Sequence, residues 1–183
     1  VWAPGLAHAA ALRPITGGSG SSDAERQHHR ILRRLLGMPP WAPTASILAE
    51  AGEPPLYVTW LVSAARLWHR VTQAPQGSLL ARALQEARQL AATQLADEPR
   101  LARAQRPWAA QLQSAMQAAG VQFGLDGAAM PPTAEVRRAA MQHYLQRVEA
   151  AAAERGASQL RHYFRLVRPS CLTPEGYGRA AYI

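Results

Sequence analysis

The stretch "SDAERQHHRILRRLLGMPPWAPTASILAEAG", residues 22–52, decides the fold because it states where helices begin and end. Ser22 is followed three residues later by Glu25, which is the capping-box pattern of a helix start. Gly37 suits the position just past the end of that helix. Each residue before a proline in "MPPWAP" is steered away from helical geometry. The stretch therefore predicts a helix followed by an extended connector.

Helical signals continue along the rest of the chain. Thr44 is placed to cap a short helix that Gly52 ends. An apolar stripe at helical spacing follows, made of Leu56, Trp60, Ala64, Leu67, Trp68 and Val71. Further helices are predicted over residues 78–97, from Pro99, and over 107–119, 133–156 and 157–168. No run of alternating β-branched residues occurs, so we predict an all-α fold: an irregular bundle of about six to seven amphipathic helices with Pro/Gly-rich connectors.

The composition of the ends differs from that of the middle. Residues 1–21 are an apolar lead-in followed by the Gly/Ser-rich linker "ITGGSGSS", residues 22–168 are the predicted helical domain, and residues 169–183 are an irregular tail. We expect the chain to be a piece of a longer protein. Much of the 48% hydrophobic content is alanine, which predicts a thin core.

The charge is strongly basic, with 20 arginines and no lysine against 12 acidic residues, a formal net charge of +8. Coding bias in a GC-rich genome explains the preference for arginine over lysine without any function. The physical result is the same for either cause: a permanently charged surface suited to bidentate phosphate contacts. No apolar run reaches the roughly 18 residues that a membrane span needs.

Signals for catalysis are lacking. Cys171 is the only cysteine, the six histidines are scattered apart from the pair His28 and His29, and the carboxylates are dispersed. Asp97 and Glu98 are interpreted as the cap of the helix begun by Pro99. No Walker loop, dinucleotide fingerprint or zinc-protease motif occurs. We expect no catalytic residue, no metal site and no cofactor in this chain.

The sequence contains more signals for ligand binding than for catalysis. Three helices carry arginines away from their apolar stripes, and each set is either a solvated face or a phosphate-contacting face. The sets are Arg26, Arg30, Arg33 and Arg34; Arg66 and Arg70; and Arg161, Arg165 and Arg168.

Aromatic residues raise a similar choice between core and recognition. In "RHYFRLVRP", Tyr163 and Phe164 either stack on bases between arginines or, sharing a face with Leu160 and Val167, belong to the core. Trp60 and Trp68 lie on the apolar stripe and should be buried. Trp41, held between prolines, is the tryptophan to which we assign a docking role.

The first third of the chain resembles a known family. "RQHHRILRRLLGMPPWAPTASILAEAGEPPL" followed by "AARLWHRV" resembles the region just after the polymerase domain in reverse transcriptases of non-LTR (LINE-type) retrotransposons. The matching residues are Arg33, Arg34, Leu35, Leu36, Gly37, Thr44, Ala45, Leu48, Glu50, Gly52, Pro55, Leu56, Arg66, Trp68, His69 and Arg70. The Pro-Trp pair of the connector departs from the family pattern.

The resemblance implies a non-catalytic part of an RNA-directed DNA polymerase. Magnesium would be expected only in the absent polymerase domain, and the partners would be RNA or DNA and that preceding domain, with no membrane and no small-molecule substrate. An intracellular location, the nucleus included, is implied. We predict that Arg30, Arg33, Arg34, Arg66 and Arg70 clamp phosphates, that His69 adds a secondary contact, and that both arginine faces line one groove.

Two alternatives stay open. The chain could be a non-catalytic helical interaction or structural module, with Trp41 docking a partner domain, or a decayed element that folds poorly.

Overall fold

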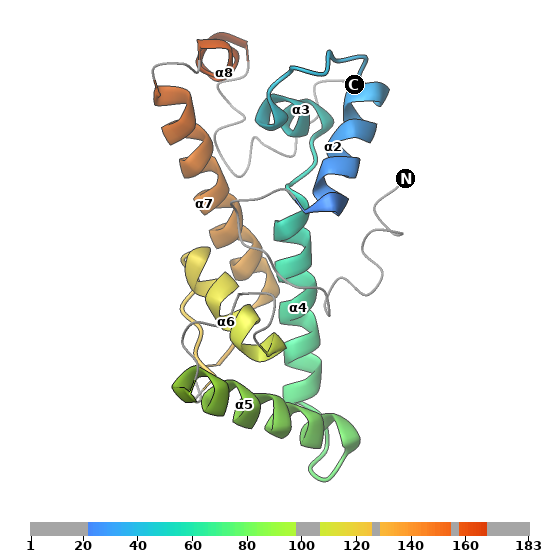
Figure 1. Ribbon diagram of the computed structural model, residues 1–183, viewed down its shortest axis with the longest axis vertical. Helices are drawn as coiled ribbons and strands as arrows, with labels where there is room; N and C mark the ends of the chain where they lie inside the picture. The colour runs from blue at the N-terminus through green and yellow to red at the C-terminus, as the bar shows by residue number, and fades with distance from the viewer. Residues whose placement is uncertain (1–21, 98–106, 126–128, 155–157, 168–183) are drawn as a thin grey trace. The chain divides into compact units, whose positions relative to one another are not determined.

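The computed structural model describes residues 22–97, 107–125, 129–154 and 158–167. Within these ranges the chain forms seven α-helices and one π-helical turn, and no strand, which confirms the all-α prediction (Figure 1). The elements are α2 (Asp23–Leu35), α3 (Thr44–Ala51), α4 (Leu56–Thr72), α5 (Leu79–Asp97), α6 (Trp108–Ala118), α7 (Thr133–Ala153), α8 (Ser158–His162) and the π-helical η3 (Tyr163–Val167).

Some of the sequence predictions concern residues outside these ranges. They include the Gly/Ser linker, the helix begun by Pro99, Arg168, Cys171 and the irregular tail.

The described residues group into two compact units. Unit 1 consists of residues 59–139, and unit 2 consists of residues 22–58 together with 140–167. Unit 1 therefore holds most of α4, with α5, α6 and the start of α7. Unit 2 holds α2, α3, α8 and η3, with the first turn of α4 and the rest of α7.

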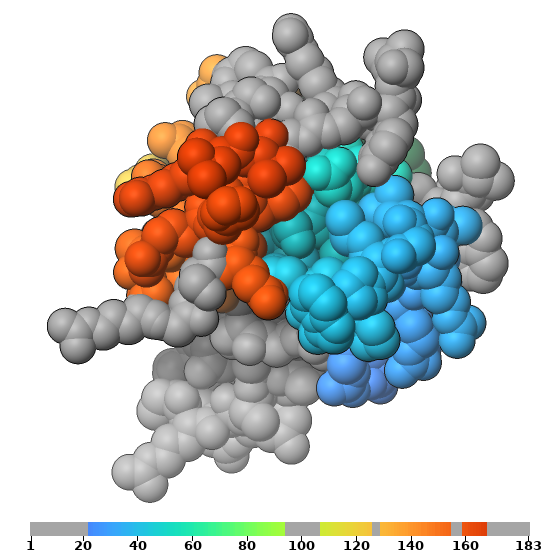
Figure 2. Space-filling model, turned by 90° about the horizontal axis from the view of Figure 1, so that it is seen from above, coloured from blue at the N-terminus to red at the C-terminus, as the bar shows by residue number. Residues whose placement is uncertain are grey.

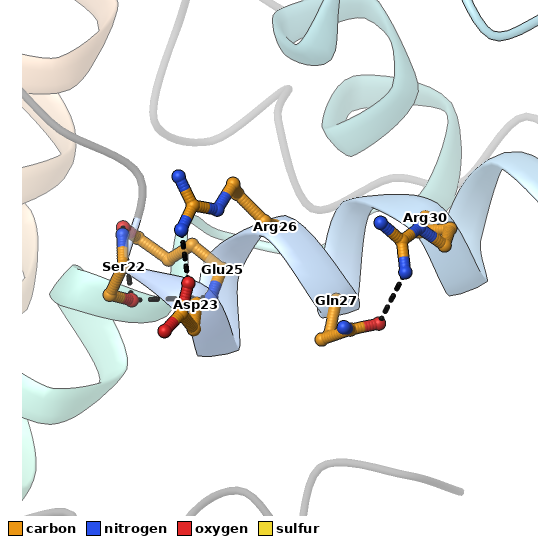
Figure 3. Close-up of polar contacts among 6 residues, drawn as sticks. All are labelled: Ser22, Asp23, Glu25, Arg26, Gln27 and Arg30. Carbon is orange, nitrogen blue, oxygen red and sulfur yellow. Dashed lines mark hydrogen bonds and ion pairs between the residues drawn. The ribbon is translucent and has the colours of Figure 1, made fainter.

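Helix α2 begins and ends as its sequence predicts. The Ser22 amide donates to Glu25 Oε2 at 3.1 Å, and the Glu25 amide donates to Ser22 Oγ at 3.2 Å, so the capping box is complete (Figure 3). At the other end Gly37 has a φ of +62°, and the Met38 amide donates to the Arg33 carbonyl at 2.9 Å. This is the Schellman arrangement, in which a left-handed residue lets the chain turn back onto the last carbonyls.

The prediction that Thr44 caps α3 is wrong. Pro43 holds the cap position with φ −59° and ψ 133°, makes no side-chain cap bond, and leaves Thr44 as the first helical residue. Proline fixes this non-helical geometry one residue earlier than the sequence pattern suggested. The Thr44 hydroxyl oxygen instead accepts a hydrogen bond from Arg33 at 3.2 Å. Gly52, with a φ of +66°, ends the helix as predicted.

The core of unit 2 combines apolar side chains with two carboxylates. Helices α2 and α3 pack side by side (Figure 1), and Ile47 and Leu48 of α3 are fully buried. The Tyr57 hydroxyl donates to the Ala140 carbonyl at 3.4 Å. Glu25 and Glu50 are also buried, each only 8% exposed, which the sequence pattern did not indicate.

The core of unit 1 is built around Trp68. Trp60 and Trp68 are each 2% exposed, which confirms their predicted burial. The Trp68 ring stacks on Trp108 with centroids 5.9 Å apart and meets the Phe123 ring edge-on at 5.0 Å. The Arg88 guanidinium lies 5.3 Å from the Trp68 ring centroid, in cation–π geometry. Much of the remaining core is alanine, including Ala64, Ala65, Ala91, Ala109 and Ala110.

The last helix is shorter and less regular than predicted. Five α-helical residues pass into a π-helical turn at Tyr163. In a π-helical turn each carbonyl accepts from the amide five residues later, whereas in an α-helix it accepts from the amide four residues later. Residues in such a turn therefore no longer lie on the face that the α-helical spacing predicts. Phe164 is accordingly buried at 2% exposure, whereas Val167, predicted on the same apolar face, is 55% exposed.

Candidate nucleic-acid interface

The six predicted nucleic-acid-binding residues fall into two sets in different units. Arg30, Arg33 and Arg34 lie on α2 in unit 2. Arg66, His69 and Arg70 lie on the part of α4 that belongs to unit 1. A single groove lined by both sets stays a prediction.

The α4 set lies together in one hollow, which we call the α4 groove. The groove has a volume of about 610 Å³. It is lined by Arg66, His69, Arg70, Gln73, Ala74, Pro75, Leu80 and Thr133. No acidic residue is among these, and both arginines are exposed. Arg66 and Arg70 are four residues apart on a helix, so their side chains are neighbours on one face.

His69 is held in a fixed orientation at this groove. Its Nε2 atom lies 3.0 Å from the Pro131 carbonyl oxygen. A carbonyl oxygen only accepts, so Nε2 must carry the hydrogen and donate it. Nδ1 is then the ring nitrogen left for any other partner. The loop carrying Pro131 therefore supports the imidazole beside the two arginines.

The α2 arginines differ from one another in what they contact. Arg33 is half-buried, and its Nη2 donates to the Ala42 carbonyl at 3.1 Å and to Thr44 Oγ1 at 3.2 Å. Arg30 is exposed and donates from Nη1 to Gln27 Oε1 at 3.1 Å (Figure 3). Arg34 is exposed. Arg33 thus braces the connector from inside, whereas Arg30 and Arg34 face solvent.

Few arginines in the described ranges are neutralised by carboxylates. The ion pairs found there are Arg26 with Asp23, seen in Figure 3, and Arg138 with Glu135 at 3.8 Å. Arg34, Arg66 and Arg70 form no ion pair with any described residue. Their charges are therefore available to an outside anion.

The connector between α2 and α3 presents Trp41 to solvent. The Ala42 amide donates to the Pro39 carbonyl at 3.0 Å, which closes a turn around Trp41. The Trp41 side chain is 71% exposed. It lines a second hollow of about 590 Å³, which we call the Trp41 groove, with Pro43, Ser46, Gln159, His162, Tyr163 and Val167. Figure 2 shows this face, where orange-red α8 and η3 lie beside the cyan connector and α3 with a hollow between them.

The sequence pattern pointed to Trp41 but not to the residues that form the other wall of its groove. His162 and Tyr163 are more than 120 residues away along the chain, so no local pattern links them to Trp41. The one available signal was the aromatic content of "RHYFRLVRP". The structure confirms the core interpretation for Phe164 and places Tyr163 at the groove, where base stacking stays a prediction.

Titratable groups of α2 are perturbed mainly by burial. Burial raises the pKa of the Glu25 carboxyl, against the lowering effect of its hydrogen bonds at the helix start. Burial lowers the pKa of His28, and it lowers the pKa of His29 to about 4, with smaller contributions from His28 and Arg33. The described ranges contain no cluster of three or more histidine, cysteine or acidic side chains arranged to hold a metal ion.

None of the described helices combines the length and the apolar content that a bilayer crossing requires. Comparison with protein-family models, curated proteins and solved structures finds no match to this chain.

Proposed function

We propose that this chain is a nucleic-acid-binding helical region of a non-LTR retrotransposon reverse transcriptase, with no catalytic site of its own. The observation that carries the binding proposal is the α4 groove. There, two exposed arginines one helical turn apart border a hollow whose described lining residues include no acidic side chain. The family assignment rests on the sequence resemblance of residues 22–75.

Phosphate is the ligand group that this groove suits best. Each guanidinium is permanently charged and presents paired N–H donors that match two phosphate oxygens. Neutralising a backbone phosphate also releases condensed counterions, which favours binding at low salt. His69 lies at the same place with its orientation set by Pro131, and its Nδ1 would contact a phosphate oxygen only when it also carries a hydrogen to donate.

The proposed binding is not strongly sequence-selective. Phosphate contacts position a nucleic acid but carry no base information by themselves. RNA and DNA are therefore both proposed ligands, and the preceding polymerase domain of the same polyprotein is the proposed protein partner. That domain, rather than this chain, would hold magnesium and perform the chemistry inside the cell.

A second candidate function is a non-catalytic interaction module. The observation that favours it is Trp41, a large aromatic side chain that is 71% exposed. Exposed aromatic residues are enriched at protein interfaces. In this alternative the arginines are solvated surface charges, and Arg70 stabilises the carboxyl end of α4, where a cation is favoured.

Salt titration separates these two functions. Fluorescence anisotropy of the whole chain with a labelled RNA hairpin and a labelled DNA duplex should show binding that weakens log-linearly with salt concentration. Circular dichroism on the same sample would establish that the protein is helical. A folded, helical protein that binds neither nucleic acid would overturn the proposed function and favour the interaction module.

A further inference from the structure

The strongest feature outside the α4 groove is the preorganised display of Trp41. Two hydrogen bonds hold the connector next to it: the Ala42 amide to the Pro39 carbonyl at 3.0 Å, and Arg33 to the Ala42 carbonyl at 3.1 Å. Prolines at positions 39, 40 and 43 restrict the backbone on both sides. An indole that is 71% exposed is thus held on a stiff segment, which lowers the entropy cost of binding to it.

The wall opposite Trp41 supplies polar and aromatic groups. His162 and Gln159 are exposed and line the groove, and the Tyr163 ring lines it while its hydroxyl donates to Glu50 at 2.6 Å. The amide of Gln159 can donate and accept, as can a neutral imidazole. The groove therefore offers flat apolar surface together with adaptable hydrogen-bonding groups.

The charges around the Trp41 groove decide which flat ligand it suits. None of the described residues that line the groove is acidic, and the nearby Glu50 is buried and hydrogen-bonded to Tyr163. The chain as a whole carries a formal net charge of +8. A neutral aromatic group flanked by negative charge complements this surface, and a nucleotide in a single strand has that composition.

We propose that the Trp41 groove binds one unstacked base of a single-stranded nucleic acid, with the base stacked on the Trp41 indole. The proposal rests on the proposed function, because it gives that nucleic-acid ligand a second contact. Gln159 and His162 would contact the edges of the base, and the net positive charge of the chain would attract the flanking phosphates. Because every base has a stackable face, the groove would accept any of them.

The test compares two single-stranded RNA oligonucleotides of equal length and charge, one carrying bases and one with an abasic backbone. The wild-type chain should bind the base-carrying strand about tenfold more tightly, from the stacking of one base. W41A should lose that preference and leave abasic binding unchanged, whereas W41F, which keeps a ring, should retain most of it. The control is Leu166→Ala, which changes an exposed apolar residue of η3 that does not line the groove. It should change the affinity for neither strand.

The other possible results separate the stacking proposal from the proposed function. Equal wild-type binding to both strands would overturn the stacking proposal and leave the proposed function standing. Binding to neither strand would overturn the stacking proposal, and the hairpin and duplex titrations would then decide the proposed function. A proline-rich peptide that binds the wild type but not W41A, while W41A keeps its base preference, would assign the groove to a protein partner and overturn the proposal. Because Trp41 is exposed, W41A should keep the wild-type circular dichroism spectrum and unfolding midpoint.

Discussion

The hydroxyl of Tyr163 donates a 2.6 Å hydrogen bond to Oε1 of Glu50, which joins η3 to α3 across 113 residues of chain. Glu50 is only 8% exposed, so hydrogen-bond donors within the protein must replace part of the water that its carboxylate loses on folding. This contact fixes the aromatic wall of the Trp41 groove to the helix that follows the connector.

Removing that hydroxyl should destabilise the protein. Tyr163→Phe keeps the ring but deletes the donor to a buried carboxylate, and we expect a loss of about 1–3 kcal/mol in the free energy of unfolding. Urea denaturation followed by circular dichroism measures it. Glu50→Gln keeps an acceptor oxygen and should cost less. An unchanged midpoint in Tyr163→Phe would show that the bond contributes nothing to stability.

The two adjacent arginines of α2 should separate into a structural and a surface residue. Arg33→Ala removes hydrogen bonds to Ala42 and Thr44 and should cost about 1 kcal/mol of unfolding free energy. Arg34→Ala removes the same charge from an exposed position and should change stability by less than about 0.5 kcal/mol. Denaturation of both variants under the same conditions checks the difference, and equal effects would contradict the bracing role of Arg33.

The start of α2 should depend on its capping box. Ser22→Ala deletes the acceptor for the Glu25 amide and should lower the free energy of unfolding by about 1 kcal/mol. Ser22→Asp supplies another acceptor and a charge favoured at a helix N-terminus, so it should restore most of the stability. If the alanine and aspartate variants unfold alike, the box does not stabilise the helix.

Acid should destabilise the protein through His29. Its pKa is lowered from the ordinary 6.5 to about 4, so the unfolded chain binds a proton before the folded chain does. Stability contributed by neutral His29 is therefore full above pH 6.5 and is lost as the pH falls toward 4. His28 acts in the same direction, whereas the raised pKa of Glu25 favours the folded state as the pH falls.

The measurement is the free energy of unfolding at about pH 7, 5.5 and 4.5, which run from above the ordinary pKa of 6.5 down toward the shifted pKa of about 4, in the wild type and in His29→Gln. Because Glu25 is present in both proteins, the difference between their slopes isolates His29. The variant should lose less stability than the wild type as the pH falls from 6.5 toward 4. Parallel slopes would show that His29 is not buried enough to titrate abnormally.

Local patterns predicted the helices because helix ends are encoded locally. Ser22 with Glu25, Gly37, Gly52 and the spacing of Trp60 and Trp68 each act within one or two turns, and the structure agrees with all of them. The cap of α3 was misplaced by one residue, since a proline and a threonine compete for that position.

The contacts and groove walls that local patterns did not predict depend on residues that are far apart in the sequence. Glu50 pairs with Tyr163, and Trp41 shares a groove with His162, each across more than a hundred residues. A single sequence contains no local sign of such pairings. Arg33 matched the pattern of a surface arginine for the same reason: its partners lie beyond the turn at Gly37.

The proposed function is tested most directly by the salt dependence of nucleic-acid binding in the Arg66→Ala/Arg70→Ala double variant. Duplex DNA affinity should fall, and the slope of log affinity against log salt should flatten by about 0.9 for each phosphate that the protein no longer neutralises, up to nearly two units. Arg82→Ala/Arg147→Ala removes the same number of exposed arginines, which form no ion pair with a described residue and lie outside the α4 groove, and should leave the slope close to that of the wild type. Equal slopes in the wild type and the groove variant, or an equal weakening in both double variants, would contradict a phosphate site in the α4 groove.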